Sequence, residues 1–458
     1  MARAKAAPVN RETPFHIHEL FVSTTDEKGH ITFGNPTFVR VSGWDEEELI
    51  GSAHNIVRHP DMPRSVFKLF WDYLLAGKPV AAYVKNMSKD GRYYWVMAMA
   101  EPVPGGYTSV RLKPSTPYFD VARDIYSELR ALEASIEGDD VRRRKEAMDV
   151  SGVRLLELLR GAGFRSYDEF MRTALPAEVV SREQLVAAER RSRSVRTADV
   201  DPRLVRLLRG CESAHRLLTT LAGQLASYAE LGESLAPRAA SVLDLSSDIE
   251  LFSMNARIAA VRLGNSATLG AVADILRSQS NAVGPLLSAL GSEMNDAVGM
   301  LEHMGFEVAA AKLQTEMMEV YVRELTQAEG DPEAAHDQLA LRADSVAIAV
   351  DDVCNSLTSL EKHLRELMQS AQAIVRDLKV IRSLEVNGRI EATRIEEGAQ
   401  LKTLFRTIGR RVRLACKEME EFDRVRDLMD ARDSSAERVA RTQVEAVRDS
   451  VAALASAA

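Results

Sequence analysis

Residues 350–374 read VDDVCNSLTSLEKHLRELMQSAQAI and contain the clearest repeating pattern of this 458-residue chain. Apolar residues recur there in alternating steps of three and four, which keeps one face of an α-helix apolar. They are Val350, Val353, Leu357, Leu360, Leu364, Leu367, Ala371 and Ile374. A seam that lasts for more than three heptads is typical of helices that pack side by side as a coiled coil.

The same kind of pattern extends through the last 250 or so residues. An earlier seam consists of Val242, Leu245, Ile249 and Phe252. Turn-forming residues interrupt the pattern near 264–266, 330–332 and 398. These breaks define four helices of roughly 55–60 residues, each about 85 Å long at 1.5 Å per residue. Helices of equal length joined by short turns predict a long antiparallel coiled-coil four-helix bundle.

An internal repeat pairs these helices. Residues 254–262 read MNARIAAVR and residues 386–394 read VNGRIEATR, so that five of the nine positions are identical. The repeat predicts a first helical hairpin over residues 205–328 and a second over residues 335–458. Two hairpins in one chain can bury their seams against each other. We therefore expect either a monomer that forms a pseudo-dimer or a homodimer.

The N-terminal part of the chain has a different composition and a different pattern. All three tryptophans lie within the first hundred residues. Short alternating segments predict strands over Phe21–Thr25, Ile31–Phe33, Val80–Asn86, Tyr93–Ala100 and Tyr107–Leu112. Short helices, among them residues 64–76, separate the first two strands from the last three. This order predicts an α+β domain.

The domain boundaries follow from these patterns. We expect an N-terminal tail over residues 1–19, the α+β domain over residues 20–116 and a helical connector over residues 117–204. Gly161, Gly163 and Pro176 are expected to break the connector helices.

Composition excludes several classes of function. The formal net charge of −8 argues against nucleic acid as a partner, since phosphate binding needs a basic surface. The three cysteines are far apart and form no CxxC, which indicates free thiols in a reducing cytoplasm. No apolar run reaches 18 residues and no signal peptide precedes the first domain, so we expect a cytoplasmic protein without a membrane span. Since kinase, P-loop, nucleophile and metal motifs are also missing, we expect no enzyme.

Residues 20–116 resemble the PAS domain of bacterial aerotaxis receptors. The resemblance rests on Ser23–Asp26, Thr37–Val39, Val41–Trp44, His54–Pro63, Phe70–Trp71, Val84–Asn86 and Tyr94–Val96. It implies a PAS fold that binds FAD without a covalent bond and signals through the redox state of the flavin. It also implies that six residues line or order the flavin pocket. They are Asn35, Arg58, His59, Asp61, Trp71 and Asn86.

The roles of these residues leave alternatives open. Asn86 can bond the polar edge of the flavin ring, and Trp71 can pack on its face or belong to the core. Arg58 can compensate the diphosphate or hold Asp61 in a bidentate pair, which would only order the loop. Where the family has a tryptophan, this chain has Val80 and Ala81. A haem with His54 and His59 as its ligands is a further alternative, but no family motif supports it.

Residues 249–280, together with the repeat at 386–394, resemble the signalling tip of methyl-accepting chemotaxis proteins. The resemblance implies a helical hairpin whose tip binds other receptors, a coupling protein and a histidine kinase. The corresponding partner-binding residues are Asn255, Arg262, Asn387, Glu391 and Arg394. The resemblance is degenerate, since Ala259 stands where the family has glutamate and both turns lack the glycine-rich run. The alternative is a set of plain coiled-coil helices.

Together these features predict a redox or oxygen sensor of the aerotaxis type. Its helical bundle would pass the signal to chemotaxis-like partners. The partners considered are the chemotaxis histidine kinase and the coupling protein. The alternative is a cytoplasmic PAS-containing regulator or scaffold that binds a non-chemotaxis partner through the same helices.

Overall fold

A computed structural model describes residues 6–138, 140–190, 202–262, 267–325, 332–394 and 399–422, with two single residues at 427 and 442. The chain divides into two compact units. The first consists of residues 1–222, 305–353 and 435–458, and the second of residues 223–304 and 354–434. The boundaries between the units fall inside the expected hairpins. Residues 205–328 and residues 335–458 therefore each contribute to both units. Most of the last 36 residues of the second hairpin lie outside the described ranges.

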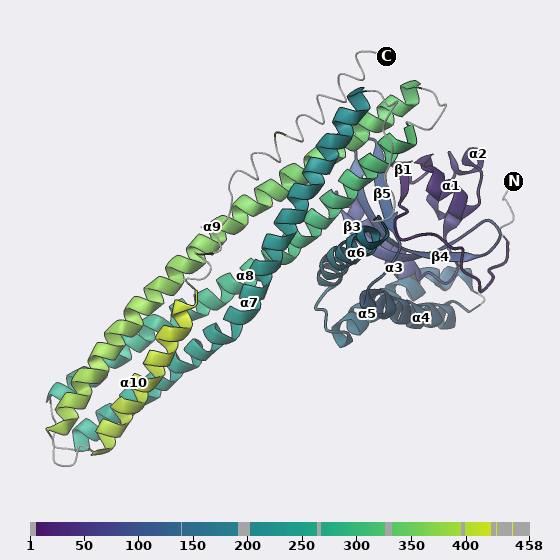
Figure 1. The fold of residues 1–458 in the computed structure, drawn as a ribbon. Coiled ribbons are helices and arrows are strands. Elements are labelled where there is room, and N and C mark those ends of the chain that lie inside the picture. The colour runs from purple at the N-terminus through teal and green to yellow at the C-terminus, as the bar shows by residue number, and fades with distance from the viewer. Residues whose placement is uncertain are drawn as a thin grey trace. The chain divides into compact units, whose positions relative to one another are not determined.

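Five strands form one antiparallel sheet in the first unit (Figure 1). They are β1 (Phe21–Asp26), β2 (Ile31–Gly34), β3 (Val80–Met87), β4 (Tyr93–Val103) and β5 (Gly106–Leu112). Their order across the sheet is β2-β1-β5-β4-β3. The strands agree with those expected from the alternating segments, and the predicted α+β fold of the N-terminal domain is confirmed.

Short helices connect β2 to β3, and side chains from elsewhere fix where they begin. They are α1 (Pro36–Ser42), α2 (Glu46–Leu49), η1 (His54–Val57) and α3 (Arg64–Leu75). The side chain of Asn35 caps α1 by accepting a hydrogen bond from the Phe38 amide. No side chain of its own caps α3. Instead the buried carboxylate of Glu133 accepts bonds from the amides of Arg64 and Ser65, at 2.9 and 3.1 Å.

The strand register divides the sheet into two faces. Arg111 lies opposite Phe21 on β1 and Ala98 on β4, and Ala98 lies opposite Ala82 on β3, so these side chains share one face. The guanidinium of Arg111 lies over the ring of Phe38, which shows that α1 covers this face. We call it the inner face.

Helices after the sheet cover the opposite, outer face. They are α4 (Pro117–Glu137), η2 (Val141–Arg143), α5 (Arg144–Gly161) and α6 (Tyr167–Arg190). The rings of Tyr83 and Trp95 lie 5.7 and 5.3 Å from that of Phe119 on α4. Tyr83 also donates a hydrogen bond to Glu178 on α6. The residues 117–190 therefore complete the hydrophobic core around the sheet.

One expected helix break is confirmed and another is wrong. The helix α5 ends at Gly161, and Gly163 follows with a φ of 95°, which an L-residue rarely adopts. Pro176, in contrast, lies inside α6. A proline costs a helix interior about 3 kcal/mol. Because Ala174 and Leu175 beside it are fully buried, tertiary packing offsets that cost.

Four helices follow, and the breaks between them lie where expected. They are α7 (Pro202–Arg262), α8 (Ala267–Leu325), α9 (Pro332–Thr393) and α10 (Ala399–Glu420). The first three have 61, 59 and 62 residues, close to the expected length of roughly 55–60, whereas the fourth is described over only 22 residues. In α7, α9, α10 and the first part of α8, most described buried residues recur at steps of three and four, whereas α8 is buried on nearly all sides from Phe306 to Val322. In α9 this seam runs from Leu339 to Ala392 and includes all eight residues of the stretch at 350–374. The predicted change to an all-α region after the PAS-like domain is confirmed.

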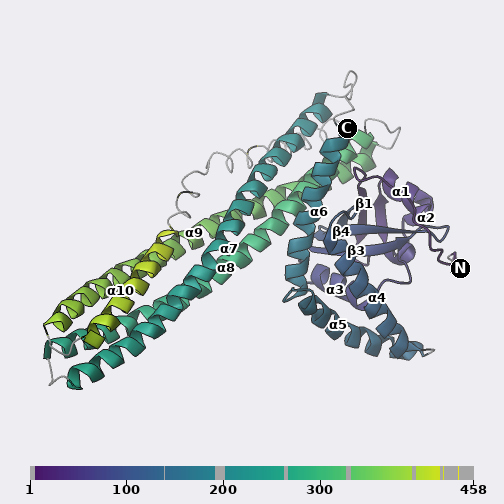
Figure 2. The ribbon, with the colours of Figure 1, turned by 60° about the horizontal axis from the view of Figure 1, so that its bottom comes forward.

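Side-chain contacts in the second unit join each long helix to two others. Arg257 of α7 pairs with Asp274 of α8 at 2.8 Å, and Ser370 of α9 donates to Glu293 of α8 at 3.3 Å. An ion pair between Arg411 and Asp248 joins α10 to α7. The helices α9 and α10 also run side by side (Figures 1 and 2).

In the first unit, α8 and α9 contact the sheet. Phe33 of β2 packs against Tyr321 of α8, with ring centroids 5.6 Å apart, and the guanidinium of Arg342 from α9 lies over both rings. Gln314 of α8 donates a hydrogen bond to Glu101 of β4. The sheet and the long helices therefore share one hydrophobic and polar contact region.

We predict that Glu178 is essential to the stability of the first unit. Its buried carboxylate accepts hydrogen bonds from the Tyr83 hydroxyl and from the amides and hydroxyls of Ser115 and Thr116. Glu178→Ala leaves these donors without an acceptor and should lower the free energy of unfolding by about 3 kcal/mol or more. Urea denaturation followed by tryptophan fluorescence measures this change, because all tryptophans lie in the N-terminal domain.

The matched control is Glu157→Ala. Glu157 lies on α5 with its side chain 53% exposed and pairs with Arg154, so the change should be about 0.5 kcal/mol or less. Equal destabilisation by the two variants would contradict the role assigned to Glu178.

A second prediction concerns pH. Burial, together with the negative charge of Asp352, raises the pKa of Glu101 to about 8, although Gln314 and Ser345 donate hydrogen bonds to it. Between about pH 4.5 and 8 the unfolded chain loses this proton and the folded chain keeps it, so the free energy of unfolding should fall as pH rises. Glu101→Gln should remove this part of the slope. Denaturation at pH 5, 6.5 and 8 tests it, and parallel profiles for both proteins would contradict it.

Candidate functional site

The inner face of the sheet combines small side chains with aromatic ones. Ala82, Ala98 and Ala100 alternate with bulky outer-face residues along β3 and β4, and all three are buried. Across from them, α3 carries Phe67, Phe70 and Trp71, which pack only partly buried against the core. Small side chains on the sheet, together with partly exposed aromatic rings on a neighbouring helix, suit the binding of a planar aromatic ligand.

Two of the expected flavin residues flank this face. Asn86 is buried on β3 and has the register of the inner face. Trp71 lies on α3, with its ring 5.4 Å from that of Tyr107 and perpendicular to it. A Cβ added at Gly29 would lie 2.9 Å from the Trp71 ring, so Gly29 is required for this approach. Asn86 and Trp71 therefore both lie at the inner face, and their contact with a flavin stays a prediction.

The loop that carries Arg58, His59 and Asp61 runs along the exposed edge of β3. Arg58 forms a backbone bridge with Asn86, and the His59 amide donates to the Lys85 carbonyl at 3.3 Å. The loop thus acts as a short extra partner for the edge strand, which otherwise presents unpaired backbone groups.

The expected alternative of an Arg58–Asp61 pair is wrong. Asp61 pairs with Lys85 at 2.6 Å, and Arg58 donates to the Met62 carbonyl while its guanidinium lies 4.0 Å from the centre of the Phe67 ring. The compact ammonium of Lys85 reaches Asp61 directly from β3, and this leaves Arg58 turned toward α3. Arg58 remains a candidate for compensating a diphosphate.

Electrostatics of the loop keep His59 neutral. Burial, and the positive charge of Lys85, lower the pKa of His59 to about 4. Its Nδ1 accepts a hydrogen bond from the Asp61 amide at 3.1 Å, which only a neutral nitrogen can do. Burial works to raise the pKa of Asp61, but the hydrogen bond and charge of Lys85 outweigh burial and lower it.

Asn35 has a structural set of partners. Its side-chain oxygen accepts from the amides of Val22 and Phe38, and its amide nitrogen donates to the Leu20 carbonyl and to Glu324 of α8. The side chain therefore joins β1, α1 and α8 within the first unit. Of the two expected roles, lining or ordering the pocket, these contacts favour ordering.

Sequence analysis did not single out Arg111, which the structure places at the centre of the inner face. Its guanidinium lies 2.6 Å from Nε2 of His54 and donates to the Ser23 hydroxyl at 2.9 Å. Burial, and the charge of Arg111, lower the pKa of His54 well below its usual value, so His54 is a neutral acceptor. A charged residue at an inward position of a strand was the available signal.

The five expected partner-binding residues lie near the ends of the long helices. Asn255, Asn387 and Arg394 are exposed, and Glu391 is partly buried. Arg394 donates to Glu391 at 2.8 Å. The helix α7 ends at Arg262, whose side chain lies outside the described part. The described side chains are thus accessible, which a docking role requires.

Two glycines set the spacing of α9 and α10 next to these residues. A Cβ at Gly388 would lie 2.4 Å from the Phe405 ring, and a Cβ at Gly409 would lie 2.5 Å from the carboxyl carbon of Glu385. Each helix thus receives a large side chain of the other above a glycine. A Cβ at Gly388 would displace the Phe405 ring, and a Cβ at Gly409 would displace the Glu385 carboxylate.

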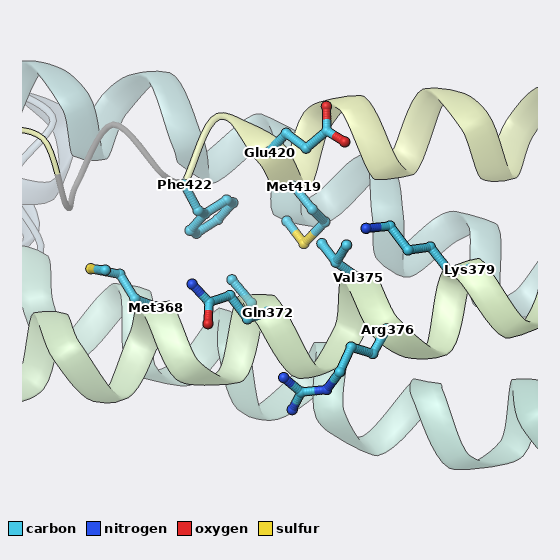
Figure 3. A pocket seen from close by; sticks show the side chains of 9 residues that line it. Met368, Gln372, Val375, Arg376, Lys379, Met419, Glu420 and Phe422 are labelled. Atoms are coloured by element: carbon cyan, nitrogen blue, oxygen red, sulfur yellow. The ribbon is translucent and has the colours of Figure 1, made fainter.

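A groove of about 460 Å³ lies further along the same two helices (Figure 3). Its lining includes Met368, Gln372 and Arg376 of α9 and Met419 of α10, with Phe422 just beyond that helix. None of the expected site residues lies there. The groove reaches the end of the described part of the chain, so we assign no ligand to it.

We predict that His59 makes the N-terminal domain sensitive to acid. Between about pH 6.5 and 4 the unfolded histidine binds a proton that the folded one does not, so the free energy of unfolding should fall as pH falls. His59→Gln keeps an acceptor for the Asp61 amide and should weaken this fall. Denaturation of both proteins at pH 7 and 4.5 measures the difference, and an equal loss in both would contradict the prediction.

Comparison with known proteins places this domain. The family described as PAS fold matches residues 31–110. Among solved structures, the PAS domain of a Colwellia psychrerythraea protein is 19% identical with a TM-score of 0.18, and the match covers 21% of this chain and 86% of that one. Of the helices in the described ranges, none has the length and apolar character that crossing a membrane requires.

Three curated relatives match part of the chain. The aerotaxis receptor of Escherichia coli is 40% identical over 126 residues, which is 26% of this chain and 25% of the receptor. A nitrogen fixation regulatory protein of Klebsiella pneumoniae is 29% identical over 82 residues, 18% of this chain and 17% of that protein. Biofilm dispersion protein BdlA of Pseudomonas aeruginosa is 28% identical over 82 residues, 18% of this chain and 20% of BdlA.

This chain therefore spans about a quarter or less of the length of each of these relatives. The chain has an N-terminal PAS domain that is homologous to parts of the aerotaxis receptor and BdlA, followed by a mostly helical region.

Proposed function

We propose that this protein is a cytoplasmic signal-transduction protein whose PAS domain holds FAD and whose long helices pass the signal to chemotaxis-type partners. The observation that carries the proposal is the 40% identity between the N-terminal quarter of the chain and the aerotaxis receptor. The positions expected to order a flavin fall inside the PAS match at residues 31–110.

The residues of the inner face fit a flavin. Nη1 of Arg111 and the hydroxyl of Tyr94 are buried and have no hydrogen-bond partner among the described residues. Such groups can bond to the carbonyl-rich edge of the flavin ring. When bound, the flavin supplies a redox state that the protein can sense. Asn86 and Trp71 would orient the ring, and the Arg58 guanidinium would compensate the charge of the diphosphate.

The outer face offers a route from the PAS domain to the helices. Asn35 bonds to Glu324, Phe33 packs on Tyr321, and Glu101 accepts a bond from Gln314, so strands β2 and β4 contact α8 directly. A shift of the sheet that changes these contacts would alter the packing of α8 and α9. Coupling of about 1–3 kcal/mol is enough for a biological response.

For the helical region, we propose a coiled-coil four-helix bundle formed by one chain. The continuous seams of α8 and α9, and the contacts from α7 to α10, support this arrangement. The partner-binding residues near the helix ends would dock a chemotaxis histidine kinase and its coupling protein. The degenerate tip sequence leaves the alternative of a scaffold for a partner outside chemotaxis.

We predict that the purified full-length protein is yellow and shows flavin absorbance. Asn86→Ala should lower the bound flavin about tenfold, because the loss of one good polar contact is worth about 1.4 kcal/mol. Flavin released on denaturation, divided by protein concentration, measures occupancy. The matched control is Asn255→Ala on α7, which should keep the full flavin content. A colourless wild-type protein that takes up no added FAD would contradict the proposed cofactor.

We also predict that the protein captures a chemotaxis kinase and coupling protein in a binding assay with purified components. Asn387→Ala and Arg394→Ala should reduce capture, because these side chains are exposed at the end of α9. Asn86→Ala, freed of flavin, tests whether capture depends on the cofactor. Binding of neither component would favour the scaffold alternative. Mass measurement in solution tests the single-chain bundle separately, and an obligate dimer that pairs hairpins between chains would contradict it.

A further inference from the structure

Arg111 is a buried cation with no counter-charge among the residues that the structure describes. It lies on β5 with only 4% of its surface exposed. The groups around its guanidinium are the Ser23 hydroxyl, the His54 ring and the face of Phe38. Among the described residues no carboxylate pairs with it, and its Nη1 has no hydrogen-bond partner.

The charge is present at neutral pH. Burial lowers the pKa of Arg111 only to about 10, so the guanidinium stays protonated at pH 7. His54 cannot neutralise this positive charge, because its imidazole is itself neutral and only accepts one hydrogen bond. An isolated buried ion costs a fold several kcal/mol, so an arginine kept in this position calls for an anionic or strongly electron-rich partner.

The surroundings indicate the shape of that partner. The rings of Phe21 and Tyr94 stack at 5.5 Å beside Arg111, and Ala98 lies directly opposite it on β4. The buried hydroxyls of Tyr94 and Ser109 also have no partner among the described residues. A ring system with polar atoms on its edge matches aromatic walls and a few donors. A hydrated diphosphate would instead need several cations or free backbone amides.

We propose that Arg111 is a cofactor-binding residue whose guanidinium contacts the polar edge of the flavin ring, with His54 and Ser23 holding the guanidinium in place. This assignment rests on the proposed flavin cofactor. It separates two sites of positive charge: Arg111 inside the domain, and Arg58 over the Phe67 ring of α3.

The test uses the full-length chain and three flavins: riboflavin, FMN and FAD. Arg111→Met removes the charge and keeps a similar volume. Without flavin, this variant should unfold at the same temperature as the wild type or higher, because an uncompensated buried charge is gone. Its affinity for all three flavins should fall by a similar factor of at least ten, since riboflavin lacks phosphate. Arg111→Lys should recover part of the loss, and Arg40→Met, with a side chain 54% exposed on α1, should lose none.

Three results would overturn the assignment. A loss confined to FMN and FAD would place Arg111 at phosphate instead of the ring. Destabilisation of the flavin-free protein with unchanged flavin affinity would make Arg111 a structural residue. If Arg111→Met does not fold, Arg111→Gln keeps a polar group in place of the charge, and wild-type affinity in that variant would also contradict the proposal. A wild-type protein that binds none of the flavins would instead refute the proposed cofactor.

Discussion

The alternation of side chains along β4 and β5 is the constraint on which both halves of the proposed mechanism depend. In an antiparallel strand successive residues face opposite sides, so Ala98 and Ala100 lie on the inner face while Glu101 lies on the outer face, where it accepts a hydrogen bond from Gln314 of α8. Neither face can be repacked alone, because a one-residue slip would exchange the two sets of side chains. A strand that moves to accommodate a ligand on one side must therefore move the groups that contact α8 on the other.

The polar residues at this interface make it sensitive to such movements. Asn35 forms four side-chain hydrogen bonds that join β1, α1 and Glu324, and Arg182 of α6 donates to two backbone carbonyls before β1 and pairs with Glu316 of α8. A buried polar network is strong when complete and costly when one bond is lost. Small displacements can thus favour one packing of the helices over another, within the 1–3 kcal/mol that coupling requires.

The helical region has its own source of specificity. Glu385 occupies a seam position of α9, is fully buried and has Arg389 as an ion-pair partner at 3.5 Å. A charged residue in an apolar seam lowers stability, but it also destabilises any register in which its carboxylate would meet a larger side chain. In this register the carboxylate lies against Gly409, and the Phe405 ring lies in the same way against Gly388. The two contacts together fix how α10 lies along α9.

The sequence by itself determined the elements that arise from local periodicity. Steps of three and four located the long helices, glycine and asparagine located their ends, and alternation located the five strands. Recognisable motifs also singled out Asn86 and Trp71, which the structure places at the inner face. These features depend on residues a few positions apart, so a linear reading contains the necessary information.

Only the tertiary structure decided what depends on distant residues. Pro176 stays inside a helix because the core packs around it, and Asp61 pairs with Lys85 from another strand instead of with its near neighbour Arg58. Asn35 gains Glu324 from a helix nearly three hundred residues away, and Arg111 proves to be a buried charge whose Nη1 has no hydrogen-bond partner in the described part of the chain. Burial and counter-charge are set by the sheet register and by the helices that cover each face, and neither is encoded in any short stretch of sequence.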